Sequence, residues 1–150
     1  MPNQTHHITM SRTLRRPAAE AFRTVGDLEH FPEFMPNVNA LTLLEVDGDR
    51  KVAAWDTTID DAPLTWIEEG IYDEENLIVR FRALEGVFDR FDGYWQVVPE
   101  GEGSRVTFEL TYEIGLPEIE DLVAPILRER MIENAESMLK AIEQRLERTS

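Results

Sequence analysis

The sequence predicts a single α+β domain in which a curled antiparallel sheet of about seven strands surrounds one long C-terminal helix. Three observations predict this class. Residues 38–114 contain six short runs of alternating polar and apolar residues, separated by turn residues. After Pro117 the apolar residues recur with the period of a helix, and a length of 150 residues suits one domain. Residues 1–150 are therefore expected to form one domain.

The segment before the sheet predicts one strand and two short helices. Residues 5–14 mix β-branched and polar side chains, which favours a strand. Pro17 suits the first turn of a helix, because its missing N–H would be unpaired there anyway. Residues 18–25 are good helix formers and end at Gly26. A second short helix is expected before Pro36. The apolar anchors of the two helices are Phe22, Leu28, Phe31 and Phe34.

Turn residues divide the following segment into six strands. Asp47-Gly48 is typical of a two-residue hairpin, and polar breaks follow at residues 60–63 and 73–76. Glu85-Gly86 and residues 99–104 form the last two turns. The strands are expected at residues 38–46, 50–59, 64–72, 77–84, 88–98 and 105–114.

A long amphipathic helix is predicted after Pro117. Because proline disturbs a helix interior, we expect a short lead-in helix and then a main helix that begins near Pro125. The expected apolar stripe consists of Ile119, Leu122, Val123, Ile126, Leu127, Met131, Ala135, Met138, Leu139, Ile142 and Leu146.

Composition excludes several classes of function. The chain has 15 basic and 30 acidic side chains, and the resulting charge of −15 disfavours nucleic acids and anionic lipid surfaces as partners. Cysteine is absent, which excludes disulfides, thiolate nucleophiles and cysteine-ligated metals. The sequence has neither a signal peptide nor a run of about 18 apolar residues. It therefore predicts a cytoplasmic protein without stable membrane insertion.

The three histidines do not predict a metal site. His6 and His7 point to opposite faces of a strand, and His30 lies in the helical segment. The sequence also lacks a nucleotide-binding or phosphate-binding glycine motif. We therefore expect neither a metal nor an organic cofactor.

A single helix cannot fill the concave side of a strongly curled sheet, so an internal apolar cavity is expected between them. Strand alternation and the helix stripe predict its wall. Aromatic rings on this wall can stack on a ligand, although each tryptophan taken alone is more often a core residue. The candidate ligand-binding residues are Phe31, Phe34, Trp55, Thr57, Trp66, Phe81, Phe91, Trp95, Phe108, Met131 and Met138.

Glu68 is the most informative polar residue of this set. It shares a strand face with Leu64 and Trp66, so it should point inward while Glu69 points to solvent. Burial raises the pKa of a carboxyl group, which suits a general acid or base, or a partner for a ligand hydroxyl. Two alternatives stay open. Glu68 could pair with an arginine within residues 80–90, or a shift of the strand by one residue could expose it to water.

Several segments resemble one superfamily. Residues 16–22 (RPAAEAF) and 27–38 (DLEHFPEFMPNV) are similar to the helical segment of START-like proteins, also called SRPBCC or helix-grip proteins. Residues 86–88, 93–95 and 112–114 resemble the polyketide cyclase/dehydrase (aromatase/cyclase) and coenzyme Q-binding branches. The likeness covers residues 5–146 and implies the helix-grip fold.

The resemblance implies binding of a hydrophobic, ring-containing small molecule, and cyclisation or dehydration of a polyketide intermediate. In aromatases of this fold it also implies a cavity arginine aided by a tyrosine. Here Gly70 stands at the arginine position and Val38 near the tyrosine position. If the chain is catalytic, the candidate catalytic residues are Glu68 and Tyr112, with Thr57 as a further hydroxyl.

Two other functions stay open. The chain could be a non-enzymatic carrier of a quinone or lipid, as the coenzyme Q-binding branch implies, or a partner-binding protein with a vestigial cavity. Arg12, Arg15 and Arg16 form a small basic patch that is either solvated or contacts an acidic acyl carrier protein. The oligomeric state stays open between monomer and homodimer.

Overall fold

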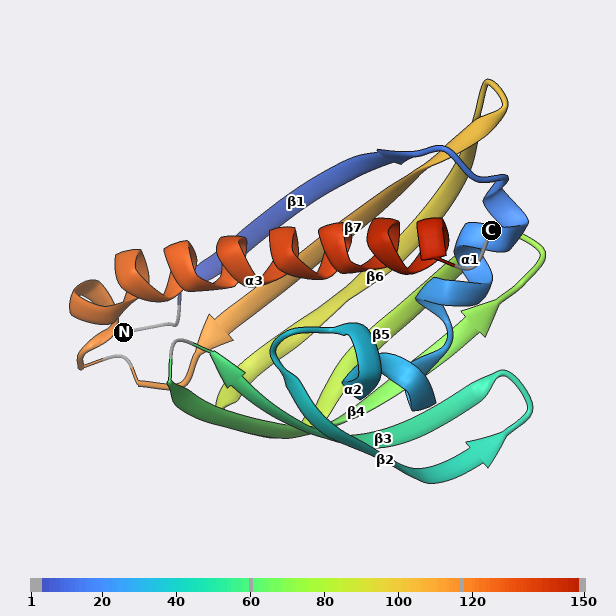
Figure 1. The fold of residues 1–150 in the computed structure, drawn as a ribbon. Coiled ribbons are helices and arrows are strands. Elements are labelled where there is room, and N and C mark those ends of the chain that lie inside the picture. The colour runs from blue at the N-terminus through green and yellow to red at the C-terminus, as the bar shows by residue number, and fades with distance from the viewer. Residues whose placement is uncertain (1–3, 60, 117, 149–150) are drawn as a thin grey trace.

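A seven-stranded antiparallel sheet wraps around one long helix in the computed structural model (Figure 1). The structure describes residues 4–59, 61–116 and 118–148. The elements are β1 (Thr5–Leu14), α1 (Ala18–Val25), the 3-10 helix η1 (Leu28–His30), α2 (Phe31–Phe34), β2 (Val38–Asp47), β3 (Arg50–Ile59), β4 (Ala62–Asp73), β5 (Ile78–Glu85), β6 (Phe88–Glu100), β7 (Gly103–Ile114) and α3 (Glu120–Arg148). The strand order is β1-β7-β6-β5-β4-β3-β2. The predicted fold class is confirmed.

The sheet curls because its strands are twisted and locally bulged. Register shifts interrupt the pairing of β2 with β3, of β4 with β5 at Ile67/Glu68, and of β6 with β7 at Phe88/Arg90. Such irregularities bend a strand and increase its twist. The sheet therefore has a concave face, and α3 crosses this face along its length (Figure 1).

The helical segment after β1 covers the part of the concave face beside the C-terminal end of α3 (Figure 1). α1 begins directly after Pro17, whose carbonyl oxygen accepts the N–H of Ala21 at 3.0 Å. Its apolar residues share one side, so that Ala21, Phe22 and Val25 are buried. The second predicted helix consists of two successive short helices, η1 and α2.

The C-terminal helix is continuous from Glu120 to Arg148, so the expectation of a separate lead-in helix is wrong. Pro125 lies in the second turn of α3 and removes the N–H that would bond to the carbonyl of Asp121. Both residues are exposed, so water can satisfy this carbonyl. The helix therefore continues through the proline.

The first turns of α3 are less buried than the apolar stripe predicts. Ile119, Leu122 and Ile126 were expected in the core, but they are 42%, 74% and 60% exposed. A helix of 29 residues is roughly 43 Å long, and its first turns direct only Val123 and a few other side chains toward the core. The buried stripe is continuous only from Met131 onward.

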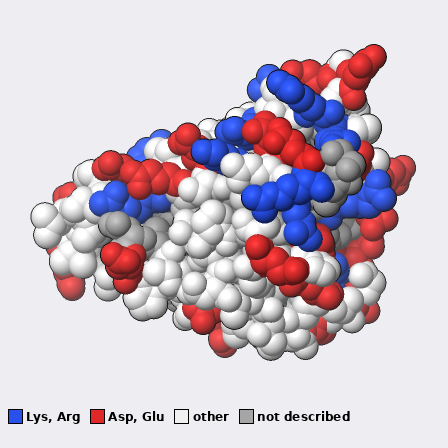
Figure 2. Space-filling model, in the orientation of Figure 1, with Lys and Arg blue, Asp and Glu red and all other residues white. Residues whose placement is uncertain are grey.

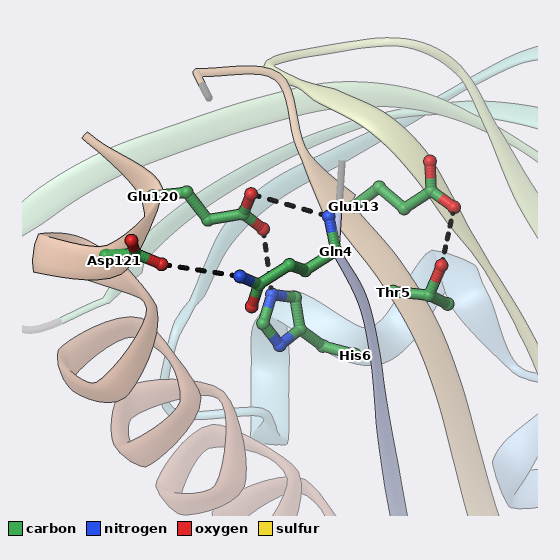
Figure 3. Close-up of polar contacts among 6 residues, drawn as sticks. All are labelled: Gln4, Thr5, His6, Glu113, Glu120 and Asp121. Atoms are coloured by element: carbon green, nitrogen blue, oxygen red, sulfur yellow. Dashed lines mark hydrogen bonds and ion pairs between the residues drawn. The ribbon is translucent and has the colours of Figure 1, made fainter. Parts of the chain in front are cut away.

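Polar contacts tie the start of β1 to the first turn of α3 (Figure 3). Nε2 of His6 lies 3.0 Å from Oε1 of Glu120, and the backbone N–H of Gln4 donates to Oε2 of Glu120 at 3.4 Å. The side-chain amide of Gln4 donates to Asp121 at 3.3 Å. Glu120 is only 4% exposed, and these donors compensate for the burial of its carboxylate.

Charged side chains are distributed unevenly over the face drawn in Figure 2. Basic side chains gather toward α1 and the C-terminal end of α3, with acidic side chains among them, while a broad area beside them carries few charges. The predicted basic patch is partly neutralised, because Arg12 pairs with Glu143 at 2.9 Å and Arg16 lies 3.9 Å from Glu20. Among the described residues, no helix is long and apolar enough to cross a membrane.

Candidate functional site

An internal cavity lies between the sheet and α3, where two clusters of buried apolar residues meet. One cluster includes Phe22, Phe31 and Trp55, and the other includes Phe108 and Met131. Most of the wall is apolar or aromatic. The wall consists of Ile8, Asn37, Val38, Trp55, Thr57, Leu64, Trp66, Glu68, Phe81, Phe91, Trp95, Phe108, Leu110, Met131, Asn134, Ala135 and Met138.

The cavity is small. The space open to the centre of a water molecule is about 50 Å³. If this space is treated as a sphere and the water radius of about 1.4 Å is added, the empty space has a radius of roughly 3.7 Å. This radius corresponds to a ligand volume on the order of 200 Å³. The cavity therefore suits a ligand of one or two fused rings better than a long acyl chain.

Aromatic rings stack on one another along the wall and account for the small volume. Trp55 and Trp66 are stacked at 5.4 Å between ring centroids, and Trp95 and Phe108 at 4.6 Å. Phe91 contacts Trp66 in a tilted arrangement at 5.5 Å. The three tryptophans thus fill part of the core and also form the wall of the remaining space.

Glu68 is the one carboxyl group among the described residues of the wall. β4 carries it inward, and protein surrounds it on all sides except the cavity, which leaves it half-buried by accessible surface. The indole N–H of Trp66 donates to Oε1 of Glu68 at 3.3 Å. Burial raises the pKa of Glu68 to about 8, although the indole groups of Trp66 and Trp55 favour the ionised form. Glu68 is therefore mostly protonated at neutral pH.

The neighbouring residue Glu69 lies on the opposite face of β4. Its carboxylate accepts hydrogen bonds from Nε of Arg50 and, at 2.8 Å, from Nε of Arg82. These two guanidinium groups hold the pKa of Glu69 below its usual value. The arginine that could have paired with Glu68 thus pairs with Glu69, and the carboxyl in the cavity has no cationic neighbour on the described wall.

The other polar groups of the wall differ in whether they are satisfied. The hydroxyl of Thr57 donates to the carbonyl of Leu64 at 2.7 Å, and the side-chain amide of Asn37 donates to Asn134 at 2.8 Å. Trp55 is only 7% exposed, and its indole N–H has no hydrogen-bond partner in the described part of the chain. This N–H is the unsatisfied donor of the site.

Gly70 lies two residues beyond Glu68 on the inner side of β4, and the side chain of Tyr72 covers it. A Cβ atom at Gly70 would lie 3.1 Å from Cε1 and 3.6 Å from the hydroxyl oxygen of Tyr72. Burial, and the nearby charge of Glu68, raise the pKa of the Tyr72 phenol, which stays neutral. The space into which a longer side chain at position 70 would extend is therefore occupied by Tyr72.

The described residues hold no cluster of His, Asp and Glu that could bind a metal ion. The three histidines lie in separate places and contact different partners. His6 lies beside Glu120, His7 beside Thr111, and His30 beside Asp27.

Comparisons with known proteins agree with this architecture. Residues 5–147 match the family described as polyketide cyclase / dehydrase and lipid transport. The chain belongs to this family. The match covers nearly all of the chain, from the start of β1 almost to the end of α3.

Solved structures show the same fold. TTHA0849 from Thermus thermophilus is 34% identical, with a TM-score of 0.91 over 97% of this chain and 99% of that chain. The Zhui aromatase/cyclase from Streptomyces sp. R1128 is 16% identical, with a TM-score of 0.90 over 97% of this chain and 95% of that chain. A START superfamily protein from Mycobacterium smegmatis is 20% identical, with a TM-score of 0.85 over 97% and 99% of the two chains. These likenesses confirm the helix-grip fold.

A curated relative carries a different kind of name. The ribosome association toxin RatA from Pseudomonas aeruginosa is 27% identical over 126 residues, which are 80% of this chain and 83% of the relative. The proteins to which this chain is similar therefore include some whose names refer to small-molecule chemistry and one whose name refers to a macromolecular partner.

The structure places most of the sequence-predicted site residues on the cavity wall. These are Trp55, Thr57, Trp66, Glu68, Phe81, Phe91, Trp95, Phe108, Met131 and Met138. Strand alternation predicts the common side of the strand residues correctly, because the register shifts on β5 and β6 fall at Leu84 and Asp89, outside the stretches that carry Phe81, Phe91 and Trp95.

Three predicted site residues do not lie on the wall. Phe31 packs behind Trp55 with 5.7 Å between ring centroids, and Phe34 lies beyond Phe31, where the guanidinium of Arg145 covers its ring. Tyr112 is fully buried and stacks on His6 at 5.0 Å. The helical segment and the end of β7 thus point these rings into the packed core instead of the cavity.

Seven wall residues were missing from the predicted set, namely Ile8, Asn37, Val38, Leu64, Leu110, Asn134 and Ala135. Asn134 had a readable signal, because it is a polar residue three positions after Met131, on the side of α3 that faces the sheet. Asn37 had none, because its place depends on how the turn before β2 meets α3.

Proposed function

We propose that this protein binds a hydrophobic, ring-containing small molecule in the cavity between the sheet and α3. The observation that carries the proposal is the wall itself, which combines stacked aromatic rings with a single buried carboxyl group. Apolar sites with a few convergent polar groups are typical of small-molecule binding. The family description, which covers polyketide cyclases, dehydrases and lipid transport, supports the same class of ligand.

The wall favours carriage of a quinone or similar ring compound over ring closure of a polyketide. Polarising several carbonyl groups during cyclisation requires a fixed positive charge or an equivalent donor set. The described wall has no Arg, Lys or His, and Tyr72 fills the space beside Gly70. The primary proposal is therefore a non-enzymatic carrier.

A polyketide cyclase or dehydrase activity is the second candidate, and Glu68 is the observation that favours it. A carboxyl group with a pKa of about 8 holds a proton at neutral pH and can donate or accept it during dehydration or aldol closure. The reaction would use no metal or organic cofactor. Tyr112 would not take part directly, because it lies away from the cavity wall.

A partner-binding function is the third candidate, favoured by the relative named for ribosome association. The charge of −15 opposes contact with ribosomal RNA, and part of the basic patch is neutralised by Glu143 and Glu20. An acidic acyl carrier protein would bind to the same basic patch, and its attraction would be reduced because Glu143 and Glu20 partly neutralise the patch. Sedimentation of the purified protein with ribosomes at physiological salt tests this candidate.

Native mass spectrometry of the freshly purified protein tests the primary proposal. We expect a co-purified apolar compound in the mass range of a small ring system, which is released by organic solvent. A protein that carries no such compound, and that binds no one-ring or two-ring compound added to it, would contradict the proposal.

Turnover assays with Glu68→Gln distinguish the carrier from the enzyme. A carrier keeps ligand binding in this variant and converts no aromatic polyketide precursor in either form. An enzyme loses turnover while it retains binding. Glu69→Gln is the matched control, because it changes a neighbouring carboxylate on the opposite face of β4.

A further inference from the structure

The cavity contains a buried hydrogen-bond donor that the described chain does not satisfy. Among the residues that the structure describes, none accepts the Nε1–H of Trp55 in hydrogen-bond geometry, although Trp55 is only 7% exposed and lines the cavity. A buried donor without an acceptor is unfavourable, and native proteins seldom retain one without a reason. An acceptor supplied by a ligand would remove this cost.

Glu68 lies close to the same donor. The ring of Trp66 is stacked on the ring of Trp55, and the indole N–H of Trp66 donates to Oε1 of Glu68. The N–H of Trp55 is close enough to the carboxyl group of Glu68 to lower its pKa, but the two groups do not reach hydrogen-bond geometry. Within the described chain, only Oε1 of Glu68 accepts a hydrogen bond, so Oε2 can carry the O–H group of the protonated acid.

We propose that Trp55 and Glu68 form a two-donor subsite that holds one uncharged carbonyl oxygen of the ligand. This inference rests on the proposed binding function and narrows it to ring compounds with a ketone or quinone carbonyl. A carbonyl oxygen has two lone pairs, so it can accept the indole N–H and the carboxyl O–H together.

The rest of the described wall offers no charged partner to a polar group on the ligand. The hydroxyl of Thr57 already donates to the backbone, and the side-chain amide of Asn37 donates to Asn134. A ligand carboxylate would be buried without a cation, and a hydrocarbon would leave the Trp55 N–H unpaired. The cavity should therefore select ligands that carry an uncharged hydrogen-bond acceptor.

Binding of the carbonyl compound should depend on pH. Above a pH of about 8 Glu68 loses its proton and becomes an acceptor only. Tyr72 is the titratable group near Glu68 and stays neutral in this range, because burial raises its pKa. The described residues that α3 and β1 contribute to the wall carry no charge. The carbonyl ligand therefore loses affinity as pH rises through 8.

A matched set of two-ring probes tests the proposal by NMR titration at pH 6.5. The probes are indane, 1-indanone and 1-aminoindane, which share a carbon frame and differ in one substituent. We expect 1-indanone to bind about tenfold more tightly than indane, because it gains two hydrogen bonds in a dry site. This preference should largely disappear at pH 9.5.

Two variants separate the donors. Trp55→Phe keeps an aromatic ring but lacks the N–H, and should lower the preference for 1-indanone about threefold to fivefold. Glu68→Gln keeps an N–H donor that does not titrate, and should retain the preference at both pH values. Glu69→Gln is the control and should show the same preference between the probes as the unmodified protein.

The outcomes distinguish the subsite from the binding function. If indane and 1-indanone bind equally well, the cavity binds ring compounds but the two-donor subsite is wrong. If 1-aminoindane binds most tightly, Glu68 acts as a carboxylate and the subsite is also wrong. If no probe binds to the folded protein, both the subsite and the proposed function are contradicted.

Discussion

Glu68 and Glu69 are adjacent in sequence, yet their carboxyl groups have opposite pKa shifts because they lie on opposite faces of β4. Glu68 faces an apolar cavity, and desolvation raises its pKa to about 8. Glu69 accepts hydrogen bonds from Arg50 and Arg82, which lower its pKa. Period-two alternation of the strand is thus enough to give one neutral acid and one anion at neutral pH.

Glu68→Gln should stabilise the protein at alkaline pH. Between pH 4.5 and about 8 the unfolded chain ionises Glu68 while the folded protein keeps the proton, so stability falls as pH rises through this window. The loss is on the order of a few kcal/mol and levels off above the folded pKa. We expect the variant to have a higher Tm than the unmodified protein at pH 9 and a similar Tm at pH 5.

Glu69→Gln provides the opposite control. Its folded pKa is lowered, so its ion pairs contribute stability above the unfolded pKa, and this contribution is lost as pH falls through the folded pKa. The variant should therefore have a lower Tm at pH 7 and approach the unmodified protein in acid. If the Tm values of the Glu68→Gln and Glu69→Gln variants depend on pH in the same way, the raised pKa of Glu68 and the lowered pKa of Glu69 are both contradicted.

Tyr112→Phe should leave stability unchanged or raise it slightly. The hydroxyl of Tyr112 is buried and has no partner in hydrogen-bond geometry within the described chain, although the nearby guanidinium of Arg128 partly offsets the rise in its pKa. Its removal therefore relieves a desolvation cost of about 1 kcal/mol. Tyr94→Phe is the control, because the hydroxyl of Tyr94 donates to Glu109 at 2.9 Å. Thermal unfolding measures the stability of both variants. A large loss of stability, or a loss of ligand binding, in Tyr112→Phe would show that the hydroxyl has a role in the protein.

At the scale of elements, the first turn of α3 depends on β1 more than on its own apolar residues. Leu122 in this turn and Ile119 directly before it are exposed, whereas Glu120 is buried against His6 and Gln4 (Figure 3). The buried carboxylate also lies in the first turn, where the helix dipole favours a negative charge.

Glu120→Ala should loosen this end of the helix. The change leaves the N–H of Gln4 and the ring of His6 without their acceptor, at a cost of about 1–3 kcal/mol. We expect faster amide hydrogen exchange in the first turns of α3 and at the start of β1. Asp121→Ala is the control, because the contact of Asp121 with Gln4 is exposed. Similar exchange in both variants would contradict the role of Glu120.

For the whole molecule, the cavity depends on α3, β1 and the inner faces of the strands together, and its volume limits the ligand. Met131 is 5% exposed and lies on the wall, whereas Leu139 is 2% exposed in the cluster beneath α1 and does not line the cavity. The two positions therefore separate the effect of cavity size from the effect of lost packing.

Met131→Ala should enlarge the cavity and admit a three-ring compound such as anthrone. Both Met131→Ala and Leu139→Ala should lower the free energy of unfolding by about 2–5 kcal/mol. Only Met131→Ala should raise the affinity for the larger compound in calorimetric titrations. A gain of affinity in Leu139→Ala of the same size would mean that general loosening, not wall volume, limits the ligand.

The sequence by itself determined the order of the elements and the inner face of each strand. Alternation, turn residues and the helical period depend on local contacts, so they are readable without a tertiary model, and they place Glu68 and Trp66 together on one side of β4. The family resemblance added the fold in which those faces enclose a cavity.

Only the tertiary structure decided which inward residues reach open space. Phe31 and Tyr112 point inward but pack behind other rings, while Asn37 reaches the wall because its turn meets α3. Contacts between distant segments also left the N–H of Trp55 unpaired beside Glu68. Such contacts depend on the curl of the sheet and the packing of particular side chains, which no local pattern in the sequence encodes.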